Sequence, residues 1–318
     1  MERFRILKNR ILLEENNEMD LKTFSSQYME KFDNFLISSL YKYSDDTNSL
    51  QEAMKYSLLS GGKRFRPLLL FAVAQLGKGK VEDTFSTAAA LEWIHTYSLI
   101  HDDLPAMDND DYRRGNLTTH RKFNEAIAIL AGDALLTAAF SLVLNQEKLS
   151  AEDRLKLTSS LAEAAGPKGM VGGQMEDIEG ETKQLTIQQM ETIHKRKTGA
   201  LIEFAIFAGC VHSRVDQPIV DALHEYAEHL GLAFQIHNDL KDVVSDEVET
   251  GKTTGKDQEL EKNTYPSILG IEKAKEKLTE EIDAATNVMI SLRNNVHSSV
   301  IDQSSISLLI ELLEYVKI

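Results

Sequence analysis

Residues 85–115 read FSTAAALEWIHTYSLIHDDLPAMDNDDYRRG, and this stretch joins a helical pattern to a dense group of charges. Up to Ile100, apolar residues recur at helical spacing. The charged residues that follow are Asp102, Asp103, Asp108, Asp110, Asp111, Arg113 and Arg114. Carboxylates held this close repel one another unless something positive lies among them. A solvated acidic loop is the simplest interpretation, but it weakens once the same letters recur elsewhere in the chain.

The helical pattern extends over nearly the whole sequence. Apolar residues recur at helical spacing in residues 50–59, 126–144 and 219–236. No sustained alternation predicts strands, and no Ser- or Pro-rich linker divides the chain. We therefore expect one all-α domain over residues 26–318, built from roughly ten helices, several of them central. Residues 1–25 are expected to form an N-terminal extension, either a short amphipathic helix or a frayed end.

The acidic motif recurs at residues 236–242, which read IHNDLKD. On a helix, Asn238 and Asp242 are i and i+4, and Asp239 and Asp242 are i and i+3. These side chains therefore share one face. Without a cation that face repels itself, but it offers the hard oxygen ligands that Mg²⁺ prefers.

The first motif is spaced differently. Asp102 and Asp108 are i and i+6, which no regular helix brings together. Pro105 between them indicates an interrupted turn. If two residues bulged out, the pair would regain i, i+4 geometry.

Magnesium held by one or two carboxylates usually also binds substrate phosphate, so cationic side chains are expected near the motifs. The candidates are Lys63, Arg64, Arg66, Arg113, Arg114, Lys195, Arg196, Lys197, Lys252, Lys256 and Lys262, and the hydroxyl group of Thr198 directly follows Lys197. Each cluster alone is typical of a solvated helix face. Their arrangement around two acidic motifs predicts a site for Mg²⁺ and a phosphorylated substrate.

The composition excludes several classes of protein. The chain has 318 residues, 42% of them hydrophobic, and a net charge of −15. It can bury a large core, and it is a poor partner for nucleic acid. The only cysteine, Cys210, excludes an intrachain disulfide and a thiolate metal cluster. We find no apolar run near the roughly 20 residues of a membrane span and no signal peptide, and we expect a cytoplasmic protein without membrane insertion.

Seven motifs in order give the sequence a close resemblance to one family. From about Ser49 onward they are SLLSGGKRFRP, IHTYSLIHDDLPAMDNDDYRRG, AILAGDALL, GMVGGQMEDIEG, IHKRKTGAL, GLAFQIHNDLKDVVSDE and TGK…EKNTYP. The chain resembles bacterial trans-prenyl diphosphate synthases, especially farnesyl diphosphate synthases. This implies an isoprenoid-synthase-like helical bundle around a deep central cavity, usually a homodimer, with the two acidic motifs facing each other.

The resemblance also implies the reaction. Isopentenyl diphosphate would be condensed with dimethylallyl or geranyl diphosphate to give farnesyl diphosphate (C15), with release of diphosphate. The cofactor would be Mg²⁺, three ions per active site, with Mn²⁺ as an alternative.

Individual roles follow from the same resemblance. The metal ligands would be Asp102, Asp103, Asp108, Asn238, Asp239 and Asp242. The allylic diphosphate would be bound by Arg113, Lys197, Thr198, Gln235, Lys252 and Lys262, near Gln174 and Asp177. The diphosphate of isopentenyl diphosphate would be bound by Lys63, Arg66, His95 and Arg114. Catalysis is expected to depend on Asp102, Asp103, Asp108, Lys197 and Asp239.

Product length is expected to depend on Tyr97 and Ser98. They precede Asp102 by five and four positions, about one helical turn. A bulky Tyr97 would resemble the tunnel floor of farnesyl-forming bacterial enzymes, and a small residue would admit a longer chain. A purely structural role as a core aromatic is compatible with this one.

The second motif departs from the family pattern. Members usually carry Asp where this chain has Asn238, and an apolar residue where it has Lys241. Asn offers a carbonyl oxygen to Mg²⁺ but lacks the charge, and Lys241 adds a positive charge near the metal face. We therefore expect weaker occupancy of the third metal and retained activity.

Three alternatives stay open. One is a C20 (geranylgeranyl) product, because pocket depth discriminates chain length only modestly. Another is a non-catalytic subunit of a longer-chain prenyl synthase, for which Asn238 is the argument. The third is a metal-dependent phosphohydrolase with His95, His101 and Asp102, but that chemistry needs several histidine ligands, and here the surplus is carboxylate.

Overall fold

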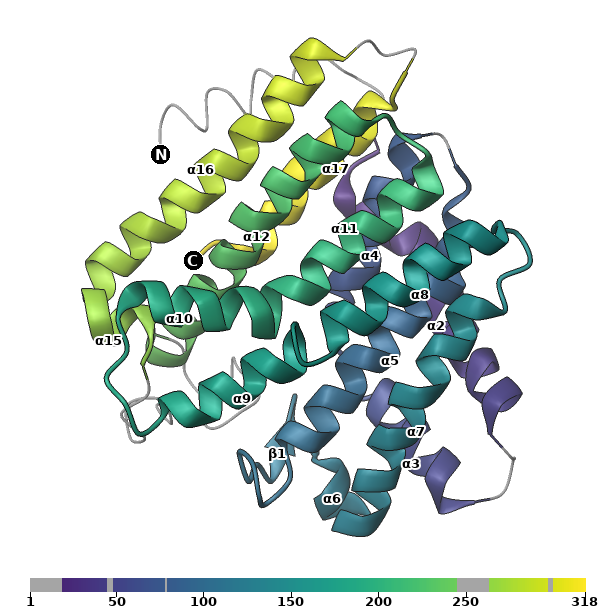
Figure 1. The fold of residues 1–318 in the computed structure, drawn as a ribbon, viewed down its shortest axis with the longest axis vertical. Helices are drawn as coiled ribbons and strands as arrows, with labels where there is room; N and C mark the ends of the chain where they lie inside the picture. The colour runs from purple at the N-terminus through teal and green to yellow at the C-terminus, as the bar shows by residue number, and fades with distance from the viewer. Residues whose placement is uncertain (1–18, 45–47, 78, 245–262, 297–299) are drawn as a thin grey trace.

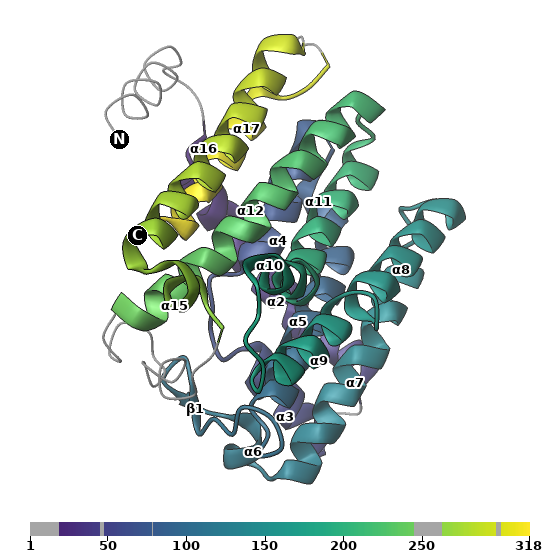
Figure 2. The same ribbon diagram turned by 60° about the vertical axis from the view of Figure 1, so that its left-hand side comes forward.

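Long helices lie side by side around α4 (Phe65–Leu76), in which every residue except Gln75 is buried (Figures 1 and 2). The structure, a computed structural model, describes residues 19–44, 48–77, 79–244, 263–296 and 300–318. The predicted all-α fold is confirmed, because the only strands in these ranges are one pair of two residues each.

The other elements follow in chain order. They are α2 (Leu21–Tyr43), α3 (Ser49–Leu58), η1 (Val81–Thr84), α5 (Phe85–Asp102), α6 (Thr119–Lys122), α7 (Glu125–Leu144), α8 (Ala151–Ala165), α9 (Met170–Gly180), α10 (Ile187–His194), η2 (Lys195–Gly199), α11 (Ala200–Ser213), α12 (Gln217–Val244), α15 (Tyr265–Leu269), α16 (Ile271–Asn295), α17 (Gln303–Leu312) and η3 (Leu313–Val316). Many begin at a polar N-cap. Thr186 and Thr264, for example, start α10 and α15 with reciprocal capping boxes.

Aromatic packing fixes α4 against its neighbours. The Phe71 ring lies 5.3 Å, centroid to centroid, from both Phe32 of α2 and Phe85 of α5. Trp93 of α5 is completely buried. Buried aromatic side chains remove much apolar surface from water and contribute strongly to stability. The ends of α4 and α5, which carry Arg66 and Asp102, are therefore held on a rigid core.

Helix α2 begins inside the segment that we expected to be an extension. Its first residue, Leu21, donates its backbone N–H to Glu311 Oε2 over 2.7 Å. Phe24 is completely buried, and Asp20 caps the helix by accepting from Thr23 N–H. The predicted boundary after residue 25 therefore falls within a helix of the core. Residues 1–18 lie outside the described ranges.

A short hairpin follows the first acidic motif, where we predicted no strand. β1 (Tyr112–Arg113) pairs antiparallel with β2 (Asn116–Leu117). The connecting residues Arg114 and Gly115 have φ of 54° and 79°, the left-handed pair that matches the twist of two adjacent strands. Strands of two residues are too short to show a periodic pattern in the sequence.

Helix α7 corrects one expectation. Glu125–Leu144 has the length and apolar composition of a membrane span, with a mean hydropathy of 2.1, although we expected no such run. One such helix is weak support for a membrane protein, because core helices share these properties. Here α7 packs against α5, α3 and α8. Part of its apolar surface, including Ile129 and Leu130, stays exposed.

Candidate active site

The first acidic motif lies where α5 ends. The helix stops at Asp102, and Asp103 donates its N–H to the Leu99 carbonyl over 3.2 Å. The chain then folds back, so that Asp108 N–H donates to the Asp102 carbonyl over 2.8 Å. The interruption predicted from Pro105 is present, but it is a helix end and not a two-residue bulge. The turn brings Asp102 and Asp108 together and leaves Asp108 exposed.

The surroundings of Asp102 favour the binding of a cation. Burial raises the pKa of Asp102 to about 6, and the charges of Asp108 and Asp103 add to this increase. Lys197 and Arg113 act in the opposite direction without cancelling it. When the surroundings stabilise the negative charge of a carboxylate poorly, a bound cation stabilises that charge strongly.

Asp103 is paired with Arg113 of the hairpin. Arg113 Nε donates to both carboxylate oxygens, at 2.7 and 2.9 Å, and Asp103 is buried. Such a two-pronged ion pair is strong and directional, and it holds β1 against the end of α5. Asp103 was predicted to bind metal and Arg113 to bind diphosphate. These two roles are coupled, because a side chain that turns toward a ligand weakens its ion pair with the other residue.

Lys197 stands on a turn of π-helix. η2 joins α10 to α11, and π-turns occur frequently at functional sites. Lys197 Nζ donates to Asp177 Oδ2 over 2.6 Å. Burial tends to lower the pKa of Lys197, but Asp177, Asp102 and Asp108 more than offset this and raise it. Lys197 is therefore a firmly charged cation between Asp177 and the first motif.

The position of Lys197 depends on a glycine in α9. A Cβ on Gly173 would lie 2.3 Å from the backbone N of Lys197 and 2.8 Å from its Cα. Both atoms are backbone, so they cannot swing aside as a flexible side chain would. The absence of a side chain at Gly173 lets α9 and η2 touch.

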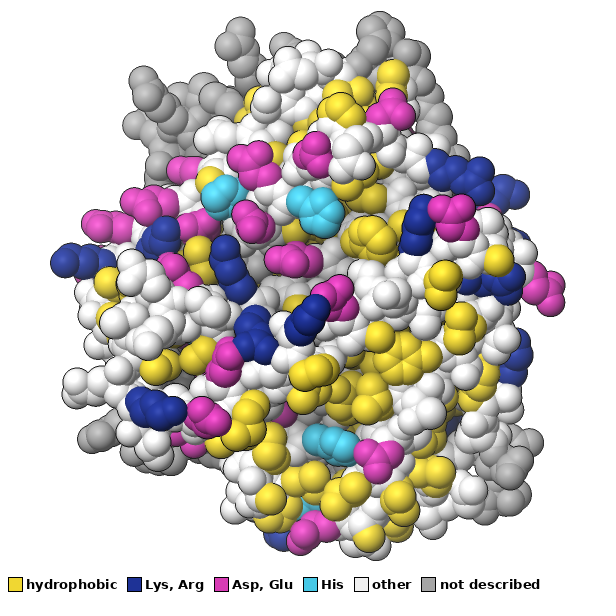
Figure 3. Space-filling view, viewed as in Figure 1, with side chains coloured by type: hydrophobic (Ala, Val, Ile, Leu, Met, Phe, Trp, Pro, Cys, Tyr) yellow, Lys and Arg dark blue, Asp and Glu magenta, His cyan; other side chains and the backbone are white. Residues whose placement is uncertain are grey.

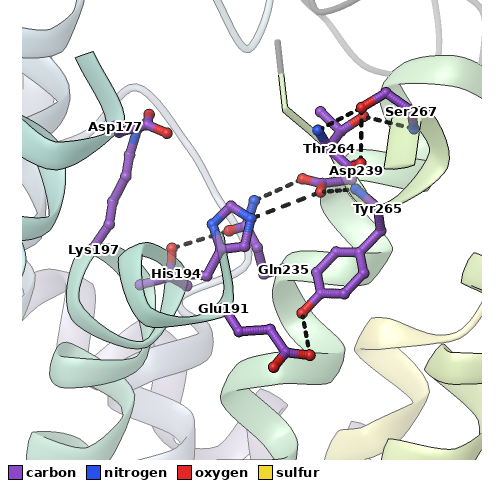
Figure 4. Close-up of polar contacts among 10 residues, drawn as sticks. Asp177, Glu191, His194, Lys197, Gln235, Asp239, Thr264, Tyr265 and Ser267 are labelled. Atoms are coloured by element: carbon purple, nitrogen blue, oxygen red, sulfur yellow. Dashed lines mark hydrogen bonds and ion pairs between the residues drawn. The ribbon is translucent and has the colours of Figure 1, made fainter. Parts of the chain in front are cut away.

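The second motif places Asp239 in a buried network (Figure 4). Gln235 Nε2 donates to Asp239 Oδ1 over 2.7 Å, and Tyr265 N–H donates to Oδ2 over 3.0 Å. The Thr198 hydroxyl donates to Gln235 Oε1 over 3.1 Å. Thr198, Gln235 and Asp239, which we predicted at one diphosphate, are therefore joined by hydrogen bonds across η2, α12 and α15.

A cavity of about 130 Å³ connects these groups. Asp177, Lys197, Gln235 and Asp239 all line it. This volume suits a diphosphate group and is below the size of a pocket for a whole lipid-like ligand. The described residues that line this pocket include Asp239 of the second motif and none of the first, so the deep cavity between the two motifs stays a prediction.

His194, which was not among the predicted site residues, lines the same cavity. Its ring stacks on Tyr265 with centroids 5.9 Å apart (Figure 4). Both ring nitrogens are buried without a hydrogen-bond partner, and Nε2 lies 3.9 Å from Asp239 Oδ2. Burial lowers the pKa of His194 to about 4, against the opposing charge of Asp177, so it is neutral at pH 7. The available signal was its place directly before the KRKTG cluster.

The other two members of the second motif differ in exposure. Asn238 is exposed, whereas Asp242 is half-buried. The Asp242 Oδ2 atom is buried and has no hydrogen-bond partner. A buried carboxylate oxygen without a partner requires an explanation, and a cation ligand is one.

We expect Asn238→Asp to lower the Mg²⁺ concentration needed for half-maximal activity severalfold, because it adds a charge to a face of hard oxygen ligands. Titrating activity against Mg²⁺ in both proteins checks this. Asn238→Ser, which also lacks the charge, is the control. Identical metal dependence in the wild type and Asn238→Asp would remove the idea that Asn238 weakens a metal site.

A second cluster of predicted residues gathers around Arg66 and His95. Arg66 Nη1 lies 3.5 Å from His95 Nε2, and Arg66 Nε is buried without a partner. Burial lowers the pKa of Arg66 to about 10. Burial, followed by the charges of Arg66 and Arg114, holds the pKa of His95 well below its ordinary value. Arg66 is thus a buried cation beside a neutral imidazole, an arrangement that an anion would stabilise.

Lys63 and Arg114 lie beside the glycine pair before α4. A Cβ on Gly62, whose φ is +126°, would fall 2.4 Å from Arg114 Nη1. Arg114 Nη1 also donates to the Gly61 carbonyl. Lys63 Nζ lies 5.4 Å from the centre of the Tyr315 ring. The turn therefore collects cations from two distant parts of the chain.

Arg64, between these residues, has a structural role. Its guanidinium group contacts Glu92 at 2.7 Å, Asp33 at 3.1 Å and the Leu58 carbonyl at 2.6 Å. Both Arg64 and Glu92 are buried. Such a buried ion pair anchors the glycine turn and engages all three nitrogens of Arg64 within the protein.

The remaining predicted residues lie as follows. Tyr97 is buried, and burial followed by the charge of Asp102 raises its pKa to about 12. Ser98 Oγ donates to the His95 carbonyl over 2.9 Å. Gln174, half-buried, lies on α9 one turn before Asp177. Lys252, Lys256 and Lys262 lie outside the described residues.

Comparison with known proteins identifies extensive similarity. Residues 47–297 match the sequence profile "Polyprenyl synthetase". The chain is 51% identical over 239 residues to a farnesyl diphosphate synthase of Geobacillus stearothermophilus, covering 74% of this chain and 80% of that protein. It is 49% identical over 251 residues to a farnesyl diphosphate synthase of Micrococcus luteus, covering 78% and 86%.

A solved structure shares the fold over nearly the whole length. It is a geranyltransferase from Helicobacter pylori, complexed with magnesium and isoprenyl diphosphate. The TM-score is 0.80 at 33% identity, and the match covers 95% of this chain and 98% of that one.

Proposed function

Because the chain belongs to the polyprenyl synthetase family, we propose that its central site condenses isopentenyl diphosphate with dimethylallyl or geranyl diphosphate to form farnesyl diphosphate. The observation that carries this proposal is the place of Lys197. It is paired with Asp177, it interacts with Asp102 and Asp108 of the first motif, and it lines the cavity shared with Asp239 of the second. One cation thus links both acidic motifs at a polar pocket.

The donor groups fit magnesium. No group of three acidic or histidine side chains encloses a metal site among the residues that the structure describes. Mg²⁺ is commonly held by only one or two carboxylates, together with water and substrate phosphates. Asp102, with its raised pKa, and the unpartnered oxygen of Asp242 are suited to this. We assign three ions to the site, with Asp103, Asp108, Asn238 and Asp239 as further ligands.

The mechanism follows from charge. Mg²⁺ would supply Lewis-acid neutralisation of the allylic diphosphate. As that diphosphate leaves, Lys197 offers positive charge, and Thr198 and Gln235 offer hydrogen-bonding groups from fixed positions. The double bond of isopentenyl diphosphate then attacks the allylic carbocation, which forms the new C–C bond and leaves a tertiary carbocation. Loss of a proton from the neighbouring carbon to the departed diphosphate then forms a double bond.

The second substrate is held by the other cluster. Arg66, Lys63 and Arg114 provide cationic groups for the diphosphate of isopentenyl diphosphate, and neutral His95 provides a ring nitrogen beside Arg66. Holding both diphosphates at fixed positions sets the reacting carbons against each other. The buried side chains around Tyr97 keep water from the carbocation.

Tyr97→Ala is expected to shift the main product from C15 to C20 or longer. The change removes a buried aromatic ring one helical turn before Asp102 and opens the tunnel floor. Separating the dephosphorylated alcohols from a reaction with geranyl diphosphate measures the distribution. Tyr97→Phe, which keeps the ring, is the control and should still give farnesol. An unchanged product pattern in Tyr97→Ala would show that another residue limits the chain.

A homodimer is part of the proposal. Figure 3 shows hydrophobic side chains gathered over the lower half of one face, where α7, α8 and α9 lie. The large exposed apolar residues of these helices are Ile129, Leu130, Leu144, Leu155, Val171, Met175 and Ile178. Exposed patches of this kind are typical of protein interfaces, and a second copy of the chain is the partner that the resemblance implies. Analytical ultracentrifugation showing only monomer at micromolar concentration would contradict it.

Product analysis tests the function. Purified protein is incubated with Mg²⁺, isopentenyl diphosphate and either dimethylallyl or geranyl diphosphate, and the alcohols are separated after dephosphorylation. Farnesol as the main species is expected. Geranylgeraniol would keep the enzyme class and overturn the C15 assignment. No product with any starter or metal would point to a non-catalytic subunit.

A further inference from the structure

One face of α12 points away from the acidic network and toward α4. Phe234, His237 and Lys241 are spaced three and four residues apart, so they share this face. The Phe234 ring lies 5.2 Å from the Phe65 ring, and the Arg66 guanidinium lies 5.9 Å from the centre of the Phe234 ring. These contacts place the face of α12 directly over the first turn of α4.

Lys241 continues this face two turns after Phe234, within electrostatic range of Lys63. Lys63 precedes α4, and its ammonium group lies over Tyr315, whose own ring is 5.7 Å from Phe65. The charge of Lys241 adds to burial in lowering the pKa of Lys63, and both lysines, after burial, lower the pKa of His237 to about 4. This face therefore carries two positively charged side chains, Lys63 and Lys241, beside the neutral imidazole of His237.

The charges of this region are unbalanced. Within the described ranges, neither Lys63, Lys241 nor Arg66 forms an ion pair with a carboxylate, although the chain carries 15 excess negative charges. Arg64, in the same loop, is by contrast saturated by Glu92 and Asp33. Glu92, whose charge also acts on Arg66, is already paired with Arg64, so the cations of this region still repel one another, and an anionic ligand removes that cost.

We propose that Lys241 is a further diphosphate-binding residue for isopentenyl diphosphate, reaching the Lys63–Arg66 cluster from α12. The proposal rests on the proposed function. On α12, Asp239 would then act at the allylic diphosphate, and Lys241 would bind the diphosphate of isopentenyl diphosphate. Asp239 accepts hydrogen bonds from Tyr265 N–H of α15 and from Gln235, one turn earlier on α12. Lys241 adds a movable ammonium group, which binds phosphate as a point charge.

The test uses Lys241→Met, which keeps an unbranched side chain and removes the charge. Isothermal titration with isopentenyl diphosphate should show a Kd raised about tenfold, as for loss of one charge-assisted contact. KM for isopentenyl diphosphate should rise similarly, while kcat, the KM for geranyl diphosphate and the Mg²⁺ requirement stay unchanged. Lys241→Arg should restore most of the affinity. Lys156→Met is the matched control, since Lys156 lies on α8, paired only with Glu152 at the surface.

The outcomes separate the two proposals. A wild-type protein that makes farnesyl diphosphate, with Lys241→Met binding isopentenyl diphosphate equally well, overturns the role of Lys241 alone. A change confined to the Mg²⁺ requirement or to the allylic KM also overturns it, because Lys241 would then act on the metal side of α12. A wild-type protein that neither binds isopentenyl diphosphate nor forms product overturns the proposed function itself.

Discussion

Replacing Asp102 by asparagine should lower kcat for farnesyl diphosphate formation about a thousandfold, because preorganised charge at a departing group is among the largest catalytic contributions. Asparagine has nearly the same shape, so the turn closed by Asp108 N–H on the Asp102 carbonyl should persist. Steady-state rates at saturating substrates and Mg²⁺ measure the effect. Asp133→Asn, which changes an exposed carboxylate of α7, is the control.

The same variant should be more heat-stable than the wild type at pH 7 in metal-free buffer. The pKa of Asp102 is raised from 3.8 to about 6 in the folded protein, so the folded state binds a proton more tightly than the unfolded chain. The free energy of unfolding therefore falls as pH rises from about 4 through 6, and asparagine avoids this loss. Thermal melts at pH 4 and pH 7 test the sign. An active Asp102→Asn variant, or one that melts lower at pH 7, would contradict the role assigned to Asp102.

Gly173→Ala is expected to reduce activity at least about a hundredfold and to lower the melting temperature. The new methyl group would overlap the backbone of Lys197, so α9 and η2 must separate. Displacing a catalytic cation by about 1 Å can cost two orders of magnitude in rate, and overpacking costs roughly 1–3 kcal/mol of stability. Rates and melts of one preparation separate the two effects.

Gly231→Ala provides the matched control on the other side of η2. A Cβ there would meet only the Cα of Gly199, at 3.4 Å, which is an ordinary contact. Alanine is also preferred to glycine inside a helix, so Gly231→Ala should be neutral or slightly stabilising. Equal behaviour of the two variants would mean that the α9–η2 contact does not set the position of Lys197.

Much of the fold could be predicted because its signals are local and repeated. Helices α3, α5, α7 and α12 appear where apolar spacing placed them, since burial on one face imposes that spacing. The hairpin at Arg114 and the start of α2 at Leu21 could not be located in the same way. The first depends on two left-handed residues, and the second on a contact with Glu311, 290 positions away.

The sequence predicted several residues that the structure brings to one pocket, but it did not predict which side chains pair with each other. The motifs named Asp102, Lys197 and Asp239, but residue identity does not show which charges neutralise each other. The pairing of Lys197 with Asp177 and the stacking of His194 on Tyr265 depend on how distant helices meet. The two arginines of GGKRFRP look equivalent in the sequence. In the structure, Arg64 forms an ion pair with Glu92, whereas the Nε atom of Arg66 is buried without a hydrogen-bond partner.

The π-turn η2 has a consequence for how this chain tolerates insertions and deletions. α10, η2 and α11 follow one another without a break, and a π-turn holds about one residue more than an α-helical turn. That residue offsets the phase of α11 by about 100° relative to α10. Deleting any one residue of 195–199 would restore a regular helix, but it would also rotate Leu201 and Ile202 out of the core or Lys197 out of the pocket. The number of residues in the segment 195–199 is therefore as constrained as their identity.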